Sequence, residues 1–323
     1  MALVRKFLFL FPFLIVGLLP AADFPQAEIS NGHITAKFYL PDPANGYYRG
    51  TRFDWSGNMP SLRTKNHEYF GQWFDKYDPQ LHDAIMGPVE EFKTNNAGLG
   101  YDEAKTGGTF IRIGVGVVRK PEEKAYRNFH TYEIVDPGRW TVKRSSDRIS
   151  FIHELSDENG YAYKYTKTFR LLKGKPQMVI DHALENKGSK HIATQQYNHN
   201  FFVIDGKPTG PDSVVQFPFE LQATRAFPNK LAAAHGKEIR YSAELEKGQS
   251  TYAEFAGAPA YDVRLENRQA KAGVHIQGDK PIAKLVYWSI RTTFCPEPYI
   301  DLSAAPGQAA KWKYTYDFYD VNP

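Results

Sequence analysis

The sequence has little cysteine and little excess of either charge. Cys295 is the only cysteine among 323 residues, which excludes an intramolecular disulfide bond and a multi-cysteine metal site. Lys and Arg number 40 against 36 Asp and Glu, and no polybasic cluster interrupts this balance. The charge distribution therefore gives no indication of a nucleic-acid partner. A chain of this length can bury a core that is large enough to fold without disulfides.

Long apolar runs are confined to the N-terminus. Residues 1–22 comprise a short basic segment with Arg5 and Lys6, an apolar run over 7–19, and small residues up to Ala22. This order is typical of a secretory signal peptide, and the run is short for a membrane span. We predict cleavage after Ala22 or the residue before it, and export to the periplasm or the medium, with no membrane contact afterwards. An uncleaved anchor is the alternative.

Helical periodicity is nearly absent from the remaining sequence. Alternating apolar residues place Ile111, Ile113, Val115 and Val117 on one face of a strand. Long alternating runs follow, with turn signals such as Glu158-Asn159-Gly160 between them. Among the short stretches, only residues 231–234 look helical. Many closely spaced strands without a βαβ rhythm predict an all-β fold, a large β-sandwich formed by one domain over residues 23–323.

Aromatic residues are abundant, with 22 Phe, 20 Tyr and 5 Trp. Most of them are expected to pack within sheets. A smaller number suits a cleft for carbohydrate, because flat apolar rings stack on the C–H faces of a sugar.

The first candidate site residue is His199, which lies in the stretch Tyr197-Asn198-His199-Asn200-Phe201-Phe202. An imidazole inside an apolar strand is partly dry and geometrically fixed, and it can exchange a proton near neutral pH. The second is Glu297, which stands between two prolines after the apolar run of residues 285–290. The prolines restrict the local backbone and would hold the carboxylate in place. A hydrogen-bonded core histidine and an exposed loop glutamate are the alternative interpretations.

These two stretches together resemble the aldose 1-epimerase (galactose mutarotase) family. The resemblance rests on Asn-His-x-x-Phe at 198–202, on Cys-x-Glu-Pro at 295–298, and on Pro-Gly-Gln at 306–308 before a final aromatic strand. Family members typically have Pro-Gly-Glu at the last motif. The resemblance implies a β-supersandwich with the site in an open cleft on one sheet. It also implies an isomerase that uses His199 as general acid and Glu297 as general base.

Mutarotation fits these two residue types. With the two groups on opposite sides of the sugar, a base removes the proton of the anomeric hydroxyl while an acid protonates the ring oxygen, and the groups exchange roles when the ring closes on the other face. The expected partner is a small sugar or glycan. The reaction requires neither a cofactor nor a metal.

Other residues that would hold the sugar match the family less closely. His130 stands in the region of the family's His-Gly pair, without the glycine. Arg52 and Arg49 are candidates by chemistry for an arginine that has no motif match, and Asp205 is a candidate for the substrate-binding aspartate, with Asp212 as the alternative. Trp73 and His82 are further candidates to line the cleft.

Two other functions remain open from the sequence. A protein of this fold can bind a glycan without turnover. A polysaccharide lyase on the same fold would use Asn, His and Tyr together. However, adjacent strand residues point to opposite faces, so Tyr197 and Asn198 cannot both reach one site. The oligomeric state and the identity of the sugar are not indicated by the sequence.

Overall fold

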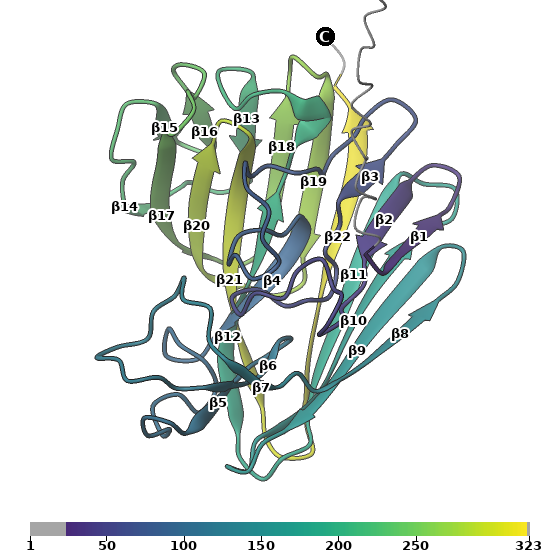
Figure 1. Cartoon of the computed structure of the whole chain (residues 1–323). Helices are drawn as coiled ribbons and strands as arrows, with labels where there is room; N and C mark the ends of the chain where they lie inside the picture. Colours follow the sequence, from purple (N-terminus) through teal and green to yellow (C-terminus); the bar gives the residue numbers. More distant parts are fainter. Residues whose placement is uncertain (1–23, 322–323) are drawn as a thin grey trace, which may run out of the picture.

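The computed structural model describes residues 24–321. The predicted signal peptide, residues 1–22, therefore lies outside the described residues. Two large antiparallel sheets lie face to face and form most of the fold (Figure 1). Within residues 24–321, no helix is long and apolar enough to cross a membrane.

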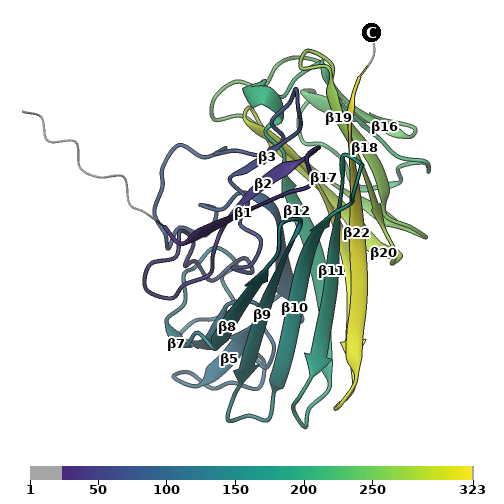
Figure 2. The same cartoon turned by 90° about the vertical axis from the view of Figure 1, so that its right-hand side faces the viewer.

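The larger sheet has ten strands. In spatial order they are β15 (Ala232–His235), β16 (Glu238–Tyr241), β13 (Ser213–Gln216), β18 (Asp262–Asn267), β19 (Ala272–Gly278), β22 (Ala309–Asp320), β11 (Gln177–Asn186), β10 (Ala162–Leu171), β9 (Arg148–Ser156) and β8 (Arg139–Arg144). Strands β8 to β11 and β22 run side by side along one side of the molecule (Figure 2).

The second sheet has six strands and carries the candidate site. Their spatial order is β14 (Ala223–Arg225), β17 (Ser250–Ala258), β20 (Ile282–Ile290), β21 (Thr293–Ala304), β12 (Ile192–Phe201) and β4 (Gly87–Lys93). Two small sheets complete the fold: β1 (Gln26–Ser30), β2 (Thr35–Tyr39) and β3 (Ser61–Arg63), and β5 (Thr109–Arg112), β6 (Gly116–Arg119) and β7 (Ile134–Asp136). A short 3-10 helix, η1 (Ile204–Gly206), follows β12.

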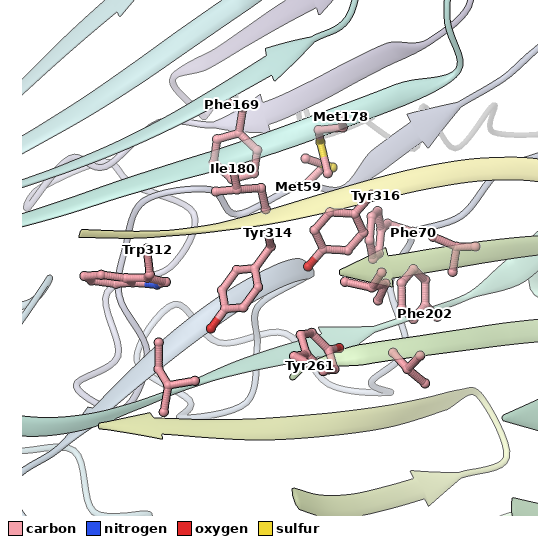
Figure 3. Packing of buried hydrophobic residues seen from close by; sticks show 14 of the residues in the cluster. Met59, Phe70, Phe169, Met178, Ile180, Phe202, Tyr261, Trp312, Tyr314 and Tyr316 are labelled. Atoms are coloured by element: carbon pink, nitrogen blue, oxygen red, sulfur yellow. The ribbon is translucent and has the colours of Figure 1, made fainter. Parts of the chain in front are cut away.

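The main core fills the space between the two large sheets. Alternate residues of β22 are buried there, among them Trp312, Tyr314 and Tyr316, as the alternation in the sequence predicts (Figure 3). The Tyr314 hydroxyl donates a hydrogen bond to Gln196 of β12 over 2.8 Å. The inner face of β12 is therefore tied to the opposite sheet, which leaves its other face available for a site.

Two sequence-based predictions of local structure are wrong. The alternation over residues 109–117 does not form one strand, because β5 and β6 form a hairpin with a turn between them. Gly114 in this turn has φ +78, and a Cβ there would lie 2.6 Å from Asp54 Oδ1. The stretch 231–234 does not form a helix, because residues 232–235 pair with β16 as β15. Four residues are too few to stabilise a helix against this pairing.

Candidate functional site

A cavity of about 430 Å³ lies on the outer face of the six-stranded sheet. This volume is within the range of small-molecule sites. Loops before β4 and between β6 and β7 supply part of its wall, and β4, β12, β17, β20 and β21 supply the rest. The lining residues are Arg52, Trp73, Asp83, Lys93, Asn128, Phe129, Tyr197, His199, Phe201, Ser250, Tyr252, Val286, Trp288, Glu297 and Tyr299.

The strand period decides which residues of β12 reach this cavity. Tyr197, His199 and Phe201 line it. Asn198 and Asn200 point between the sheets, where the Oδ1 atom of each lies 2.7 Å from the Tyr316 hydroxyl, whose single hydrogen they share. The opposite orientation of Tyr197 and Asn198 is as predicted from the sequence. The Tyr, Asn and His of this strand therefore do not assemble into one site.

His199 and Glu297 come together in the cavity, and we call them the central pair. His199 Nε2 lies 3.2 Å from Glu297 Oε1, and the two side chains are only 3% and 7% exposed. Glu297 does not lie in an exposed loop. It lies within β21, and its carboxyl faces the cavity. We expected the two groups of a mutarotase to face each other across the width of a sugar. The two side chains are instead direct neighbours.

The two prolines beside Glu297 explain how β21 makes room for the pair. The ladder between β12 and β21 ends at Tyr197 and Tyr299 and resumes only as a single bridge between Phe202 and Phe294. Prolines at 296 and 298 have no N–H group to donate in the interval between these contacts. β12 and β21 are thus not paired with each other where the central pair lies.

Aromatic rings enclose His199. The Phe201 ring stacks on the imidazole with centroids 3.9 Å apart, while Phe53 and Trp288 meet it edge-on at 5.6 and 5.9 Å. Its Nδ1 atom is buried and has no hydrogen-bond partner among the described residues. Burial, and then the nearby Arg52 guanidinium, hold the pKa of His199 well below its usual value of 6.5. The imidazole is therefore neutral at neutral pH.

Burial has the opposite effect on Glu297, because its charged form is an anion. Desolvation raises the pKa of this carboxyl from 4.5 to about 8, although Arg52 acts to lower it. At neutral pH the central pair consequently consists of a protonated carboxyl group and a neutral imidazole.

A second carboxylate, Glu91 on β4, organises the floor of the cavity. Its Oε2 accepts hydrogen bonds from Arg52 Nε over 3.0 Å and from the Tyr197 hydroxyl, and its Oε1 accepts one from Arg112 over 3.0 Å. Lys93 Nζ lies 3.8 Å from the same Oε1. Burial would raise the pKa of Glu91, but the three cations outweigh it and lower the pKa to about 2. We call these five residues the Glu91 cluster.

A different polar cluster lies behind the cavity, between the sheets. Glu90 precedes Glu91 and points inward, where it forms an ion pair with the fully buried Lys167 and accepts a hydrogen bond from Asn198 over 3.0 Å. His182 Nε2 lies 3.2 Å from Glu90 Oε1, the same oxygen that accepts the hydrogen bond from Asn198. Lys167 and His182 lower the pKa of Glu90 despite its burial. The two faces of β4 thus each carry a paired, ionised glutamate.

Two of the predicted sugar-holding residues line the cavity. Arg52 does so, and its guanidinium binds Asp83 and the Tyr197 hydroxyl in addition to Glu91. Trp73 also lines it, although Phe201 covers one face of the indole at 4.5 Å. His82 does not line the cavity. Its Nε2 atom lies 3.0 Å from the carboxylate of Asp83, which does line the cavity.

The other two predicted residues do not line the cavity. His130 lies two residues beyond Asn128, and its ring meets Tyr132 edge-on at 4.8 Å. Asp205 binds His67 Nδ1 over 2.7 Å and the Glu68 N–H over 2.8 Å, which fixes a loop near the end of β22. Neither residue reaches the central pair in this structure.

Several lining residues were missed in the sequence. Tyr299 and Lys93 each stand two positions after a glutamate of the site, so the strand period would have placed them on the same face. Trp288 of β20 pairs with Cys295. Because Cys295 stands two positions before Glu297 on β21, Trp288 lies on the same face as the central pair. Asp83, Asn128 and Phe129 come from irregular loops, for which no periodicity gives a signal. Among the described residues, no three His, Cys, Asp or Glu side chains are grouped to hold a metal ion.

No protein-family model matches the sequence, and no curated protein matches it either. Solved structures do resemble it. A galactose mutarotase related enzyme from Lactobacillus acidophilus has a TM-score of 0.57 and 13% identity, over 92% of this chain and 100% of that one. A galactose mutarotase-like protein from Clostridium acetobutylicum has a TM-score of 0.56 and 14% identity, over 92% and 95%.

A third similar structure is an aldose epimerase homologue from C. elegans, with a TM-score of 0.53 and 14% identity over 92% of this chain and 99% of that one. At such identities the likeness concerns architecture. Together with the sheet topology, it shows that this chain has the galactose mutarotase-like β-sandwich fold.

Proposed function

We propose that the protein interconverts the anomers of a free aldose by acid–base ring opening, with His199 and Glu297 as the acid–base pair. The observation that carries the proposal is their meeting in one cavity. They are about a hundred positions apart in the sequence, yet their reactive atoms lie 3.2 Å apart.

The short distance suits the reaction better than a wide separation would. The anomeric oxygen and the ring oxygen are bonded to the same carbon, so the two atoms that exchange protons are neighbours. Adjacent donor and acceptor groups can reach both of them from one side of the sugar. Each proton transfer by a positioned group contributes about 10²- to 10⁴-fold.

The resting proton defines the direction of the first step. Glu297 holds it, and His199 Nε2 is the available base. Glu297 gives its proton to the ring oxygen while Nε2 takes the hydroxyl proton, the bond between the anomeric carbon and the ring oxygen breaks, and a carbonyl group forms. Closure on the other face returns both protons. This assignment reverses the roles that the family resemblance implied for the two residues.

Because Nε2 is the base in this scheme, the resting neutral imidazole carries its hydrogen on Nδ1. An imidazolium ion is stabilised when Nδ1–H donates to a carboxylate or carbonyl group, but Nδ1 of His199 has no such partner in the described chain. The imidazolium therefore exists only while the sugar is open, with the Glu297 carboxylate beside it.

Anomer exchange measured by NMR on a panel of free aldoses tests the proposal. We expect fast exchange with at least one sugar, and a loss of about 10²-fold or more in both Glu297→Gln and His199→Ala. Glu185→Gln is the control, because Glu185 lies on β11 of the other sheet and binds Lys187 over 2.8 Å. This variant should retain full exchange.

Two results would contradict the proposal. One is a folded wild-type protein that accelerates exchange of no aldose. The other is exchange that persists in both variants of the central pair. Binding of a glycan without exchange would instead identify a carbohydrate-binding protein.

We also propose that the protein acts after export, which rests on the signal-like order of residues 1–22. Mass spectrometry of the protein from an exporting host tests this. A mature N-terminus next to residue 22 supports export, whereas an intact Met1 in a cytoplasmic fraction contradicts it.

A further inference from the structure

Lys93 is a lining residue to which the acid–base reaction gives no role. Its side chain is only 14% exposed, and its ammonium group lies at the cavity. Burial lowers the pKa of this ammonium group, while Glu91 opposes the effect. A buried ammonium group has three N–H donors and is costly to desolvate unless acceptors surround it.

The protein itself does not supply those acceptors. Across residues 24–321, Lys93 Nζ makes no hydrogen bond. Its nearest carboxylate oxygen, Glu91 Oε1, is 3.8 Å away and already accepts a hydrogen bond from Arg112. The other oxygen of Glu91 is occupied by Arg52 and Tyr197. Lys93 is thus held near Glu91 with its donors available to a ligand.

The direction of the lysine side chain brings it toward the central pair. Lys93 pairs with Gln195 on β12, four positions before His199. Its ammonium group nevertheless lies near Glu91 and 5.8 Å from the centre of the Tyr197 ring. The side chain therefore leans along the sheet in the direction of His199, and a ligand held by the central pair can extend to it.

The charges around the cavity leave one cation uncompensated. Arg52, Arg112 and Lys93 are cations, whereas Asp83 and Glu91 are the anions that face them. The central pair adds no net charge in its resting form. A neutral sugar would leave this excess in place, whereas a ligand with one negative charge would cancel it in a site of low dielectric constant.

We propose that the cavity accepts a pyranose that carries one carboxylate, a uronic acid, and that Lys93 binds this carboxylate. The carboxylate supplies charge-assisted hydrogen bonds to the free N–H donors of the ammonium group. In a uronic acid this group is attached to the ring carbon next to the ring oxygen, so it extends from the reacting atoms without taking part in the reaction. The inference rests on the proposed function and names its substrate class.

Matched pairs of sugars test the inference. Glucuronate and glucose, or galacturonate and galactose, differ only in a carboxylate against a hydroxymethyl group. We expect kcat/KM for anomer exchange of at least one uronate to exceed that of its neutral partner by about 10- to 100-fold, the worth of a hydrogen bond to a charged group. Lys93→Met should remove this preference, with a loss of kcat/KM that is about 10- to 100-fold larger for the uronate than for its neutral partner.

Lys164→Met is the matched control for a change in net charge. Lys164 lies on β10 of the other sheet, and its Nζ is also 3.8 Å from a glutamate oxygen, that of Glu185. This variant should retain the uronate preference. A neutral sugar preferred by the wild type, or equal losses for both sugars in Lys93→Met, would overturn the inference. So would a preference for the dianionic glucose 6-phosphate.

Binding of methyl glycosides separates this inference from the proposed function, because a methyl glycoside cannot open its ring. Titration calorimetry should show that methyl glucuronide or methyl galacturonide binds the wild type more tightly than its neutral counterpart, and that Lys93→Met loses the difference. If this holds while no aldose is exchanged, the proposed function fails and the carboxylate site stands. If exchange occurs but neither glycoside shows the difference, the carboxylate site fails alone.

Discussion

Replacement of Glu297 by glutamine should increase the stability of the fold at alkaline pH while it removes the proposed activity. The pKa of Glu297 in the folded protein is about 8, against 4.5 without burial. Between these two values the unfolded chain has released the proton and the folded chain still holds it. The contribution of Glu297 to the free energy of unfolding of the wild type is therefore fully present below about pH 4.5. This contribution is lost as pH rises to the folded pKa.

The size of this loss follows from the two pKa values. Each pH unit in the interval costs about 1.4 kcal/mol. The loss reaches about 3 kcal/mol at pH 7 and on the order of 5 kcal/mol above pH 8. Glu297→Gln retains the shape of the side chain and has no proton to release, so its unfolding free energy should not contain this pH dependence.

Urea unfolding followed by tryptophan fluorescence, at about pH 5, 7 and 9, measures the difference between the two proteins. It should grow with pH in favour of the variant. Glu185→Gln is a control of opposite sign, because the hydrogen bond from Lys187 lowers the pKa of Glu185. Its contribution to stability is present above the unfolded pKa, so this variant should gain nothing at pH 9. A constant difference between wild type and Glu297→Gln would refute the reasoning.

Three further predictions concern other parts of the site. The rate of anomer exchange should fall as pH rises through about 8, because Glu297 loses the proton that it donates, and a pH profile of kcat/KM that is flat to pH 9 would contradict this. Lys167→Met should lower the free energy of unfolding, measured in urea, by about 3–5 kcal/mol, because it leaves the Glu90 charge buried and without a cation. A further Glu90→Gln change should restore part of this loss. Arg52→Lys keeps the charge but loses the planar set of donors that binds Asp83, Glu91 and the Tyr197 hydroxyl, so KM for the sugar should rise by about 10-fold with a smaller change in kcat.

The fold class could be predicted because alternation is a local property of the sequence. Even spacing of aromatic residues in β10 and β22 corresponds to burial of every second side chain in the structure. The same reasoning failed at Gly114, where the alternation continues through a turn. The close approach of Asp54, which only glycine permits there, comes from a distant part of the chain.

The central pair of the candidate site could be predicted from the sequence. His199 and Glu297 stand in distinctive motifs, and the structure brings them into one cavity. Asp205 does not join them, because its residue has a left-handed conformation, with φ 49, and its carboxylate binds His67. Lining residues from loops, such as Asp83 and Phe129, depend on how separate loops pack together. That packing is not encoded in any local pattern.

The use of both faces of β12 and β4 constrains how this protein can change during evolution. Each strand carries cavity residues and core residues at alternate positions, so a single-residue insertion or deletion would exchange the two environments and disrupt both. We therefore expect homologues to vary in these strands by substitution alone. The loops that bring Asp83, Asn128 and Phe129 to the rim are free of this constraint, since they can change in length without a shift in register. Diversification toward new ligands should accordingly be recorded in loop length, while the central strands keep their spacing.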